Sequence, residues 1–281
     1  MRETLKKLRD TLRPIYGAGE TQAIIRIMFH YLKGWDTVDI LIHESDELSP
    51  FMKSEVDKIL SRLMNHEPIQ YITGEARFNG LTLKVTPDVL IPRPETDELV
   101  DIIVKENSNA EDLRILDIAT GSGCIAIALS RALKFSHVSA LDVSDKALKV
   151  AEENAKKLKT DIKFIHADIF KWMPDDKYDI IVSNPPYIDE SEKNAMEPNV
   201  LDHEPASALF VPDDNPLIFY KRITQIARDA LSAKGELYFE INPRHADELS
   251  RHLSSEGFVN VEIIRDSFGK QRFIKASQNE E

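Results

Sequence analysis

The alternation of apolar, strand-like runs with helical runs is the feature that most constrains how this chain folds. It begins at about Arg114 and continues almost to the end of the sequence. Such an order is typical of a doubly wound sheet in an α/β fold. A short turn around Gly269 separates the last two strands, which we expect to pair antiparallel. The strands are predicted at Arg114–Ala119, His137–Val143, Ile162–Ala167, Tyr178–Ser183, Glu236–Ile241, Asn260–Arg265 and Arg272–Lys275, and the helices at Cys124–Leu133, Lys146–Leu158, Pro216–Leu231 and His245–Ser255.

The part of the chain before this region indicates smaller elements. Residues 1–67 are predicted to form a bundle of four or five short helices, because apolar side chains recur at helical spacing and Ser49-Pro50 is a favourable helix start. Asn79-Gly80 lies between two apolar runs, which predicts a β-hairpin with a type I′ turn. A proline-rich connector then leads into a helix predicted at Asp97–Glu106.

Composition narrows the class of protein. The chain has 281 residues, 42% of them hydrophobic and 30% charged, which is typical of a folded globular protein. No apolar run approaches the length of a membrane span, and the charged N-terminus lacks a signal-peptide core. The single cysteine, Cys124, excludes an internal disulfide, so we expect a cytoplasmic protein. The net charge is −12 without a basic run, which disfavours nucleic-acid binding.

A small-residue loop follows the first predicted strand and opens a helix. It runs through Ala119, Thr120, Gly121, Ser122 and Gly123, where a ligand can approach the backbone and the helix N-terminus offers free N–H groups. Nicotinamide and flavin cofactors use a related loop. The loop alone therefore predicts a ligand site without identifying the ligand.

Carboxylates at the next two strand ends add detail to this ligand. Asp142, followed by Val143, can accept both ribose hydroxyls of an adenosine group. Asp168 can accept a hydrogen bond from an adenine amino group, with Ile169 and Phe170 beside the ring. The carboxyl ends of parallel strands meet at one rim, where open α/β sheets bind ligands. Together with a loop suited to an amino-acid carboxylate, these residues indicate S-adenosylmethionine.

The run Asn184-Pro185-Pro186-Tyr187 follows the fourth strand on the same rim. The Asn184 side-chain oxygen and the Pro185 carbonyl can each accept one N–H of a planar NH2 group. Two acceptors would turn the nitrogen lone pair outward, towards a methyl donor, while Tyr187 offers a flat face. Alternatively, the run is only a rigid turn that leaves a core strand.

These motifs resemble those of one known family, the N(5)-glutamine methyltransferases of peptide chain release factors (HemK/PrmC type). The similarity covers nearly the whole chain. Five motifs carry the resemblance: Glu67–Gly74, Val89–Thr96, Thr120–Ala126, Ser183–Ile188 and Glu204-Pro205. The combination of Val89–Thr96 with Ser183–Ile188 is highly specific for the family.

The resemblance implies a class I, Rossmann-like methyltransferase with a seven-stranded sheet, and methylation of the glutamine in a Gly-Gly-Gln loop. Asn184 and Pro185 would accept the amide hydrogens, with Tyr187 against the amide. We expect a monomer that needs no nucleic acid, membrane or metal. The expected segments are a helical substrate-docking domain at 1–75, a hairpin linker at 76–90 and the methyltransferase domain at 91–277.

Three stretches depart from the family pattern. Ala119 replaces a usual glycine, which we expect to alter the loop slightly. The segments 210–215 and 240–245 also differ, so the substrate rim is expected to have its own geometry.

Two other functions remain compatible with single motifs. Adenine amino-methyltransferases share the Asn-Pro-Pro-aromatic run, and a nicotinamide-dependent oxidoreductase would explain only the glycine-rich loop. Cys124 is interpreted as a packing residue, although a helix start can lower a thiol pKa. Arg93 and Glu95 either pair on the surface or lie near the site.

Overall fold

The computed structural model describes residues 1–279, which divide into two compact units. The first unit comprises residues 1–75 and 197–203, and the second comprises 76–196 and 204–279. Within residues 1–279, none of the helices combines the length and the apolar character needed to cross a membrane.

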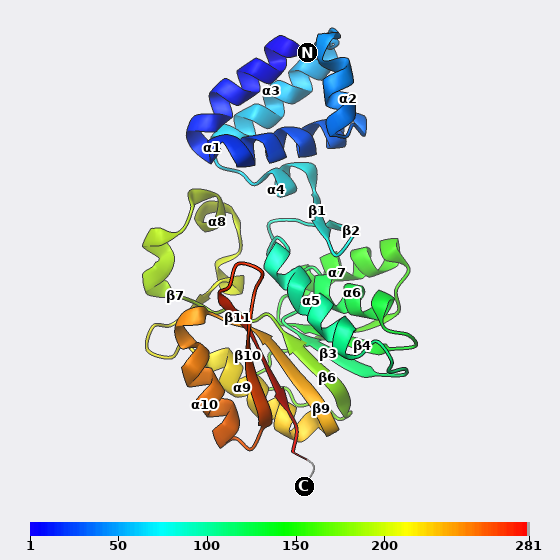
Figure 1. Cartoon of the computed structure of the whole chain (residues 1–281), viewed down its shortest axis with the longest axis vertical. Coiled ribbons are helices and arrows are strands. Elements are labelled where there is room, and N and C mark those ends of the chain that lie inside the picture. Colours follow the sequence, from blue (N-terminus) through cyan, green and yellow to red (C-terminus); the bar gives the residue numbers. More distant parts are fainter. Residues whose placement is uncertain (280–281) are drawn as a thin grey trace. The chain divides into compact units, whose positions relative to one another are not determined.

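The first unit is helical. It contains α1 (Arg2–Lys33), α2 (Thr37–Ile42), a 3-10 turn η1 (His43–Ser45), α3 (Pro50–Met64), α4 (Ile69–Thr73) and α8 (Pro198–His203) (Figure 1). Gly17 has non-helical backbone angles (φ 72°, ψ 175°), so α1 consists of two shorter helices that meet at a kink, in agreement with the predicted bundle of short helices. The second of these helices stops at Gly34. As predicted, Ser49 caps α3 by accepting from the Met52 N–H.

The predicted hairpin is formed by β1 (Glu75–Phe78) and β2 (Leu81–Lys84). Its two turn residues, Asn79 and Gly80, have φ of 46° and 70°. Positive φ at both positions is the requirement of a type I′ turn. The sequence prediction of the hairpin is therefore confirmed.

The centre of the second unit is a seven-stranded sheet in the order β10-β11-β9-β6-β3-β4-β5. Only β11 runs antiparallel to its neighbours β9 and β10. The strands are β3 (Arg114–Ile118), β4 (His137–Asp142), β5 (Ile162–His166), β6 (Tyr178–Ser183), β9 (Leu231–Glu240), β10 (Val259–Arg265) and β11 (Gln271–Ser277).

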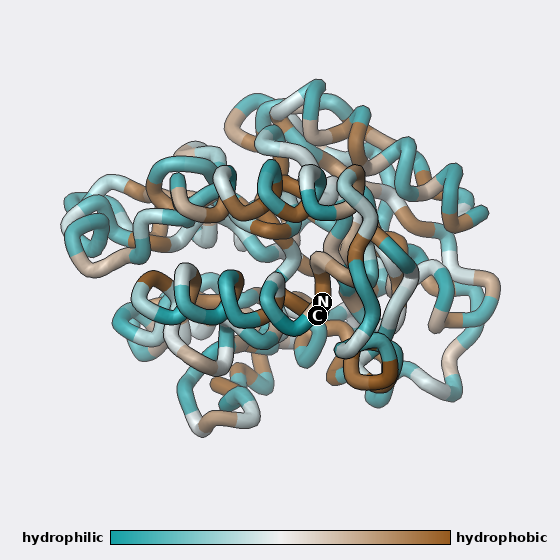
Figure 2. Tube along the Cα trace, turned by 90° about the horizontal axis from the view of Figure 1, so that it is seen from above, coloured by the Kyte–Doolittle hydropathy of each residue, from teal (hydrophilic) through white to brown (hydrophobic). Residues whose placement is uncertain are grey.

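Helices cover both faces of this sheet, each over its own hydrophobic cluster (Figure 1). One face carries α5 (Pro94–Glu106), α6 (Cys124–Ala132) and α7 (Asp145–Leu158), and the other carries α9 (Ile218–Ala230) and α10 (Ala246–Ser255). Hydrophilic and hydrophobic residues alternate along the helices (Figure 2), as helices with one buried face require. The architecture is the α/β fold that the sequence predicted.

The remaining elements lie between β6 and β9 and follow the sheet rim. They are β7 (Ile188–Asp189), η2 (Glu190–Ala195), η3 (Ala206–Ala208) and β8 (Phe210–Val211), with η4 (Pro243–His245) after β9. β7 and β8 pair in parallel as a small separate sheet, which the sequence did not predict because each strand has two residues.

Some element boundaries differ from the prediction. The helix α5 begins at Pro94, three residues before the predicted start, because proline is favourable at a first helical position. The strand β9 begins at Leu231, a residue that we had placed in the preceding helix. Its register with β6 shifts between Leu231 and Glu236, and Lys234 has a φ of 66°. Because the stretch is irregular, its sequence lacks the pattern of a strand.

Candidate active site

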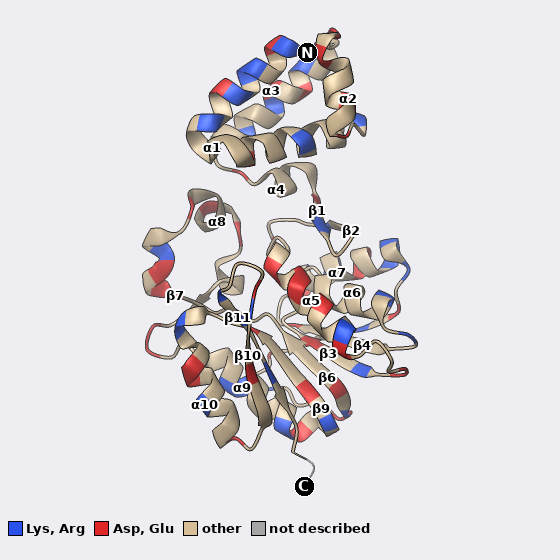
Figure 3. Cartoon of the chain, in the orientation of Figure 1, with Lys and Arg blue, Asp and Glu red and all other residues tan. Residues whose placement is uncertain are grey.

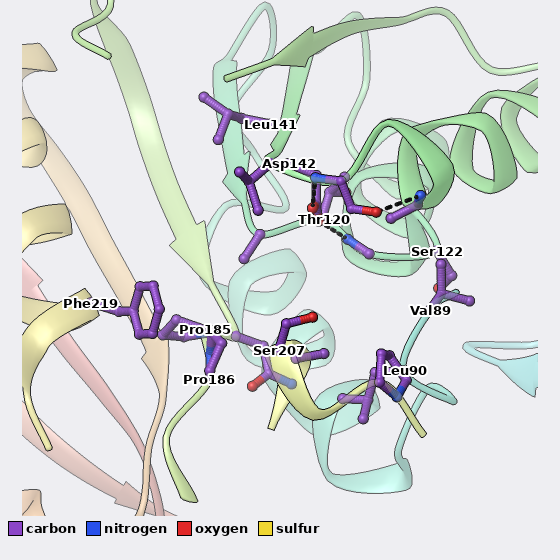
Figure 4. Close-up of a pocket in the computed structure, with 18 of the residues that line it drawn as sticks. Val89, Leu90, Thr120, Ser122, Leu141, Asp142, Pro185, Pro186, Ser207 and Phe219 are labelled. Carbon is purple, nitrogen blue, oxygen red and sulfur yellow. Dashed lines mark hydrogen bonds between the residues drawn. The ribbon is translucent and has the colours of Figure 1, made fainter. Parts of the chain in front are cut away.

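A cavity of about 340 Å³ lies at the carboxyl ends of β3, β4 and β6 in the second unit. Its volume falls at the lower end of the range of small-molecule sites. In Figure 4, Pro185, Pro186 and Phe219 gather on one side, and Thr120 and Asp142 lie on another. The predicted site residues that line it are Ala119, Thr120, Gly121, Ser122, Asp142, Val143, Asp168, Ile169, Asn184, Pro185 and Pro186.

The small-residue loop has the backbone geometry that its sequence indicates. Ala119, Gly121 and Gly123 have φ of 61°, 55° and 80°. Ala119 therefore adopts the left-handed conformation that glycine takes without strain, at a cost of roughly 1–2 kcal/mol. The loop keeps its turn despite this departure from the family pattern. A hydrogen bond of 3.0 Å from the Thr120 N–H to the Leu141 carbonyl ties it to β4.

The two glycines of the loop have different surroundings. A Cβ on Gly123 would lie 3.1 Å from Ala151 Cβ and 3.2 Å from Ile127 Cδ1, whereas a Cβ on Gly121 would meet no atom within 4 Å. Gly123 therefore serves the packing of α6 on α7 and does not itself line the cavity. Gly121 leaves open space next to the cavity.

Asp142 holds the loop through its carboxylate. Its two oxygens accept from the Gly121 N–H and the Ser144 N–H, each at 2.9 Å. Burial raises the pKa of Asp142, while these backbone hydrogen bonds lower it. The side chain is thereby fixed at the cavity edge.

Asp117 lies beneath the loop and is fully buried. One of its oxygens accepts from Thr120 Oγ1 at 2.6 Å and from the Ala126 N–H at 3.2 Å. Burial raises the pKa of this carboxyl to about 7. Sequence reasoning did not assign a role to Asp117.

The third carboxylate, Asp168, turns the chain after β5. It accepts from the Phe170 N–H at 3.0 Å. Arg222 of α9 holds the same turn, since its guanidinium donates to the Ile169 and Trp172 carbonyls at 2.6 and 2.7 Å. The Phe170 and Phe219 rings pack 5.6 Å apart, which makes this end of the cavity aromatic.

Asn184 is hydrogen-bonded to Thr96, which is in turn hydrogen-bonded to Glu240, and the sequence analysis assigned a role to neither Thr96 nor Glu240. The Asn184 Nδ2 donates to Thr96 Oγ1 over 3.2 Å, and this hydroxyl donates to Glu240 Oε2 over 2.7 Å. Glu240 is the last residue of β9, and the register pairs Ser183 with Phe239, so Asn184 and Glu240 leave the sheet as neighbours. The sequence signal that could have indicated Glu240 is its position as a polar residue near the end of the predicted strand next to β6.

Tyr187 is fixed by the same carboxylate but is not among the cavity-lining residues. Its hydroxyl donates to Glu240 Oε1 over 2.9 Å, and its carbonyl accepts from Asn242 Nδ2 over 3.1 Å. Burial and the nearby Glu240 raise the pKa of Tyr187 well above its usual value. The phenol therefore remains a hydrogen-bond donor at neutral pH.

Arg93 lines the cavity and pairs with the buried Glu204, not with Glu95. Glu204 also accepts from the Ile91 N–H at 3.2 Å. Its side chain is 1% exposed, so Arg93 supplies its compensating charge. This pair joins the stretch at 91–93 to the rim at 204–208, where Pro205, Ser207 and Ala208 also line the cavity.

The divergent segment after β9 braces the chain that follows Tyr187. Asn242 Nδ2 donates to Glu192 Oε1 at 2.8 Å, and His245 contacts the Asp189 carboxylate at 2.9 Å. In the other divergent segment, Asp213 accepts from the Ser191 N–H at 3.0 Å. These contacts hold the rim that follows residues 184–186, which we call the clamp, in place.

Cys124 lines the cavity, and its pKa moves in the direction opposite to that of a reactive thiol. Burial and the nearby Asp117 raise the pKa of Cys124 to about 12. The thiol therefore remains neutral at physiological pH, in agreement with its interpretation as a packing residue.

Comparison with family models matches two regions of the chain. Residues 3–74 match the PrmC N-terminal domain, and residues 91–204 match the methyltransferase small domain. Together these two models cover most of the described fold.

Curated relatives align over nearly the full length. The chain is 45% identical to the release factor glutamine methyltransferase of Bacteroides thetaiotaomicron, over 96% of this chain and 98% of that protein. It is 44% identical to the protein of the same name from Flavobacterium psychrophilum, over 95% of each. A third, from Streptococcus pneumoniae, is 40% identical over 91% of each.

Solved structures support the fold. A methyltransferase from Pyrococcus furiosus superposes with a TM-score of 0.53 at 16% identity, over 71% of this chain and 90% of that one. The human methyltransferase 10 domain containing protein gives 0.52 at 20% identity, over 72% and 90%.

Proposed function

The chain belongs to the family of release factor glutamine methyltransferases, and from this premise we propose that it methylates the side-chain amide nitrogen of the Gly-Gly-Gln glutamine in peptide chain release factors. Membership makes it an S-adenosylmethionine-dependent methyltransferase. The single observation that carries the proposal is the position of Asn184 on the cavity that also holds the glycine loop and Asp142.

The residues of the cavity fit S-adenosylmethionine. The open space beside Gly121 lets an amino-acid group approach the loop, and Asp142 offers carboxylate oxygens for ribose hydroxyls. Asp168 and the aromatic end at Phe170 suit an adenine ring. When bound, this compound supplies an electrophilic methyl group on a sulfonium.

The clamp residues act on the acceptor. Asn184 Oδ1 and the Pro185 carbonyl each accept one N–H of the glutamine amide. These two hydrogen bonds reduce the conjugation of the nitrogen with the amide carbonyl, so its lone pair is free for an in-line attack on the methyl group. Positioning of this kind can supply most of a rate enhancement. After transfer, the surplus proton on the nitrogen passes to water. Tyr187, held by Glu240, keeps the turn behind the amide rigid.

The names of the relatives favour a glutamine over an adenine as the acceptor. The net charge of −12 agrees with this choice, and Figure 3 shows Lys and Arg interspersed with Asp and Glu along the ribbon of both units. The N-terminal unit, which matches the PrmC N-terminal domain, is proposed to dock the release factor.

The test is incubation of the enzyme with labelled S-adenosylmethionine and an intact release factor, followed by digestion and mass spectrometry. We expect one methyl group on the Gly-Gly-Gln glutamine, and none on a matched release factor in which that glutamine is alanine. Duplex DNA serves as the second acceptor. Label on adenine, or on another residue of the release factor, would contradict the proposal.

A further inference from the structure

The hydrogen bonds behind the clamp connect three elements that are distant in the sequence. Thr96 lies in the first turn of α5, Asn184 follows β6, and Glu240 ends β9. Asn184 Nδ2 donates to Thr96 Oγ1 at 3.2 Å, and Thr96 Oγ1 donates to Glu240 Oε2 at 2.7 Å. The other oxygen of Glu240 accepts from the Tyr187 hydroxyl at 2.9 Å.

The chemistry of these groups determines the direction of each bond. The Thr96 hydroxyl has a single proton, which it donates to Glu240, a carboxylate that also accepts from Tyr187. The Thr96 oxygen is then able only to accept from Asn184. Of the two ends of the Asn184 amide, only the NH2 group donates, so Nδ2 faces Thr96 and Oδ1 is turned away from it.

Burial makes this arrangement difficult to reverse. Thr96 and Glu240 are each 2% exposed, so water does not replace either partner. Hydrogen bonds to a charged acceptor are stronger than those between neutral groups, and a buried carboxylate left without donors is costly. A flipped Asn184 would place its oxygen against the Thr96 oxygen, with no proton between them.

We propose that Thr96 and Glu240 are positioning residues that set the rotation of the Asn184 amide, so that Oδ1 and not Nδ2 is presented to the acceptor nitrogen. With Nδ2 facing the substrate, two NH2 groups would oppose each other and the nitrogen would not be activated. This inference rests on the proposed function, because the amide that Asn184 holds is the substrate of that reaction.

The experiment measures single-turnover methyl transfer to release factor at saturating S-adenosylmethionine. Thr96→Val keeps the shape of the side chain and removes the hydroxyl. We expect it to lower the rate by about 10²-fold, as a misaligned reacting group does. Thr96→Ser restores the hydroxyl and should recover most of the rate. Calorimetric titration should find the affinity for S-adenosylmethionine changed by no more than about twofold, because the cofactor contacts are intact.

Thr224→Val is the matched control. Thr224 is also fully buried and donates through Oγ1 to a carbonyl, that of Tyr220, at 2.7 Å, but it does not line the cavity. Its loss should leave the transfer rate near that of the wild type. If Thr96→Val fails to fold, the pair Thr96→Ala and Thr96→Ser, which differ by one hydroxyl, gives the same comparison.

A double-mutant cycle separates positioning from a general structural role. In an Asn184→Ala background, Thr96→Val should lower the rate little further, because Thr96 acts through Asn184. An equal loss in both backgrounds, or a wild-type rate for Thr96→Val, would overturn the inference alone. A wild-type enzyme that transfers no methyl group to glutamine would instead overturn the proposed function, and this inference with it.

Discussion

The two walls of the cavity are built by different means. The wall that we propose binds the cofactor (the cofactor wall) is made of residues 119–122 with Asp142, and it is held by hydrogen bonds such as the one that Asp142 accepts from the Gly121 N–H, 21 positions away. The clamp wall is made of residues 184–186 with Thr96, and it is held by the hydrogen bond between Asn184 and Thr96, 88 positions apart, and by that between Thr96 and Glu240, 144 positions apart. The cofactor wall thus depends on contacts between two neighbouring strands, whereas the alignment of Asn184 depends on a helix and a strand that are far from it in the sequence.

The largest effect is expected from removing the carboxylate of the cofactor wall. Asp142→Ala loses both proposed ribose contacts and the bond to the Gly121 N–H. At about 1.5–3 kcal/mol for each hydrogen bond to a charged group, affinity for S-adenosylmethionine should fall by 10²-fold or more. Calorimetric titration measures this directly. Unchanged affinity would show that this wall does not bind the cofactor.

The ion pair at the edge of the clamp wall should matter for stability. Arg93→Ala leaves Glu204, whose side chain is 1% exposed, without its charge partner, at a cost of roughly 3 kcal/mol in unfolding free energy. Lys149→Ala, which breaks the exposed pair with Asp145, is the control and should change stability little. Urea unfolding compares the two variants. Equal effects would mean that the long-range pair does not hold this wall.

Alanine substitutions at Gly121 and Gly123 should differ in their effect on stability. Gly123→Ala combines a φ of 80° with two contacts near 3.1–3.2 Å, so we expect a loss of about 2 kcal/mol or more in unfolding free energy. Gly121→Ala meets no atom within 4 Å and bears only the strain of its φ, as Ala119 already does. A greater loss from Gly121→Ala than from Gly123→Ala would contradict the assigned packing role.

The buried acid beneath the cofactor wall gives a pH-dependent effect. The folded pKa of Asp117 is about 7, above the ordinary value of 3.8, so between these values the folded chain keeps a proton that the unfolded chain has lost. Its contribution to the unfolding free energy therefore falls as pH rises from about 4 to 7, by at most about 1.4 kcal/mol per pH unit.

Asp117→Asn removes this titration while keeping the shape of the side chain. The unfolding free energy of the variant minus that of the wild type should therefore increase from about pH 4 to 7 and become constant above pH 7. Urea unfolding at several pH values measures the difference. A difference that is constant from pH 4 to 8 would mean that Asp117 does not titrate in this way.

The sequence predicted much of the fold because period and turn residues are local signals. The hairpin at Asn79-Gly80 and the seven strands of the large sheet follow from such signals. The irregular start of β9 and the two-residue strands β7 and β8 did not, since too few residues carry a pattern there.

The residues of the candidate site likewise fall into those that local sequence signals predicted and those that they did not. The loop at 119–123 and the carboxylate of Asp142 are adjacent to strands that the sequence marks clearly. The hydrogen bonds of Asn184 to Thr96 and of Thr96 to Glu240 could not be predicted, because they form only when α5 and β9 are in place in the folded unit. Tyr187 was predicted to lie against the substrate amide, but its side chain does not line the cavity, and its hydroxyl donates to Glu240.

The most direct test of the proposed role of Asn184 is the rate of methyl transfer by Asn184→Ala, measured in a single turnover at saturating S-adenosylmethionine and release factor. We expect the rate to fall by about 10²–10³-fold, as it does when one preorganised hydrogen-bonding group is removed from an active site. Cofactor affinity should remain near that of the wild type, because the cofactor wall is intact. A variant that methylates the release factor at the wild-type rate would contradict the role of Asn184 as the amide clamp.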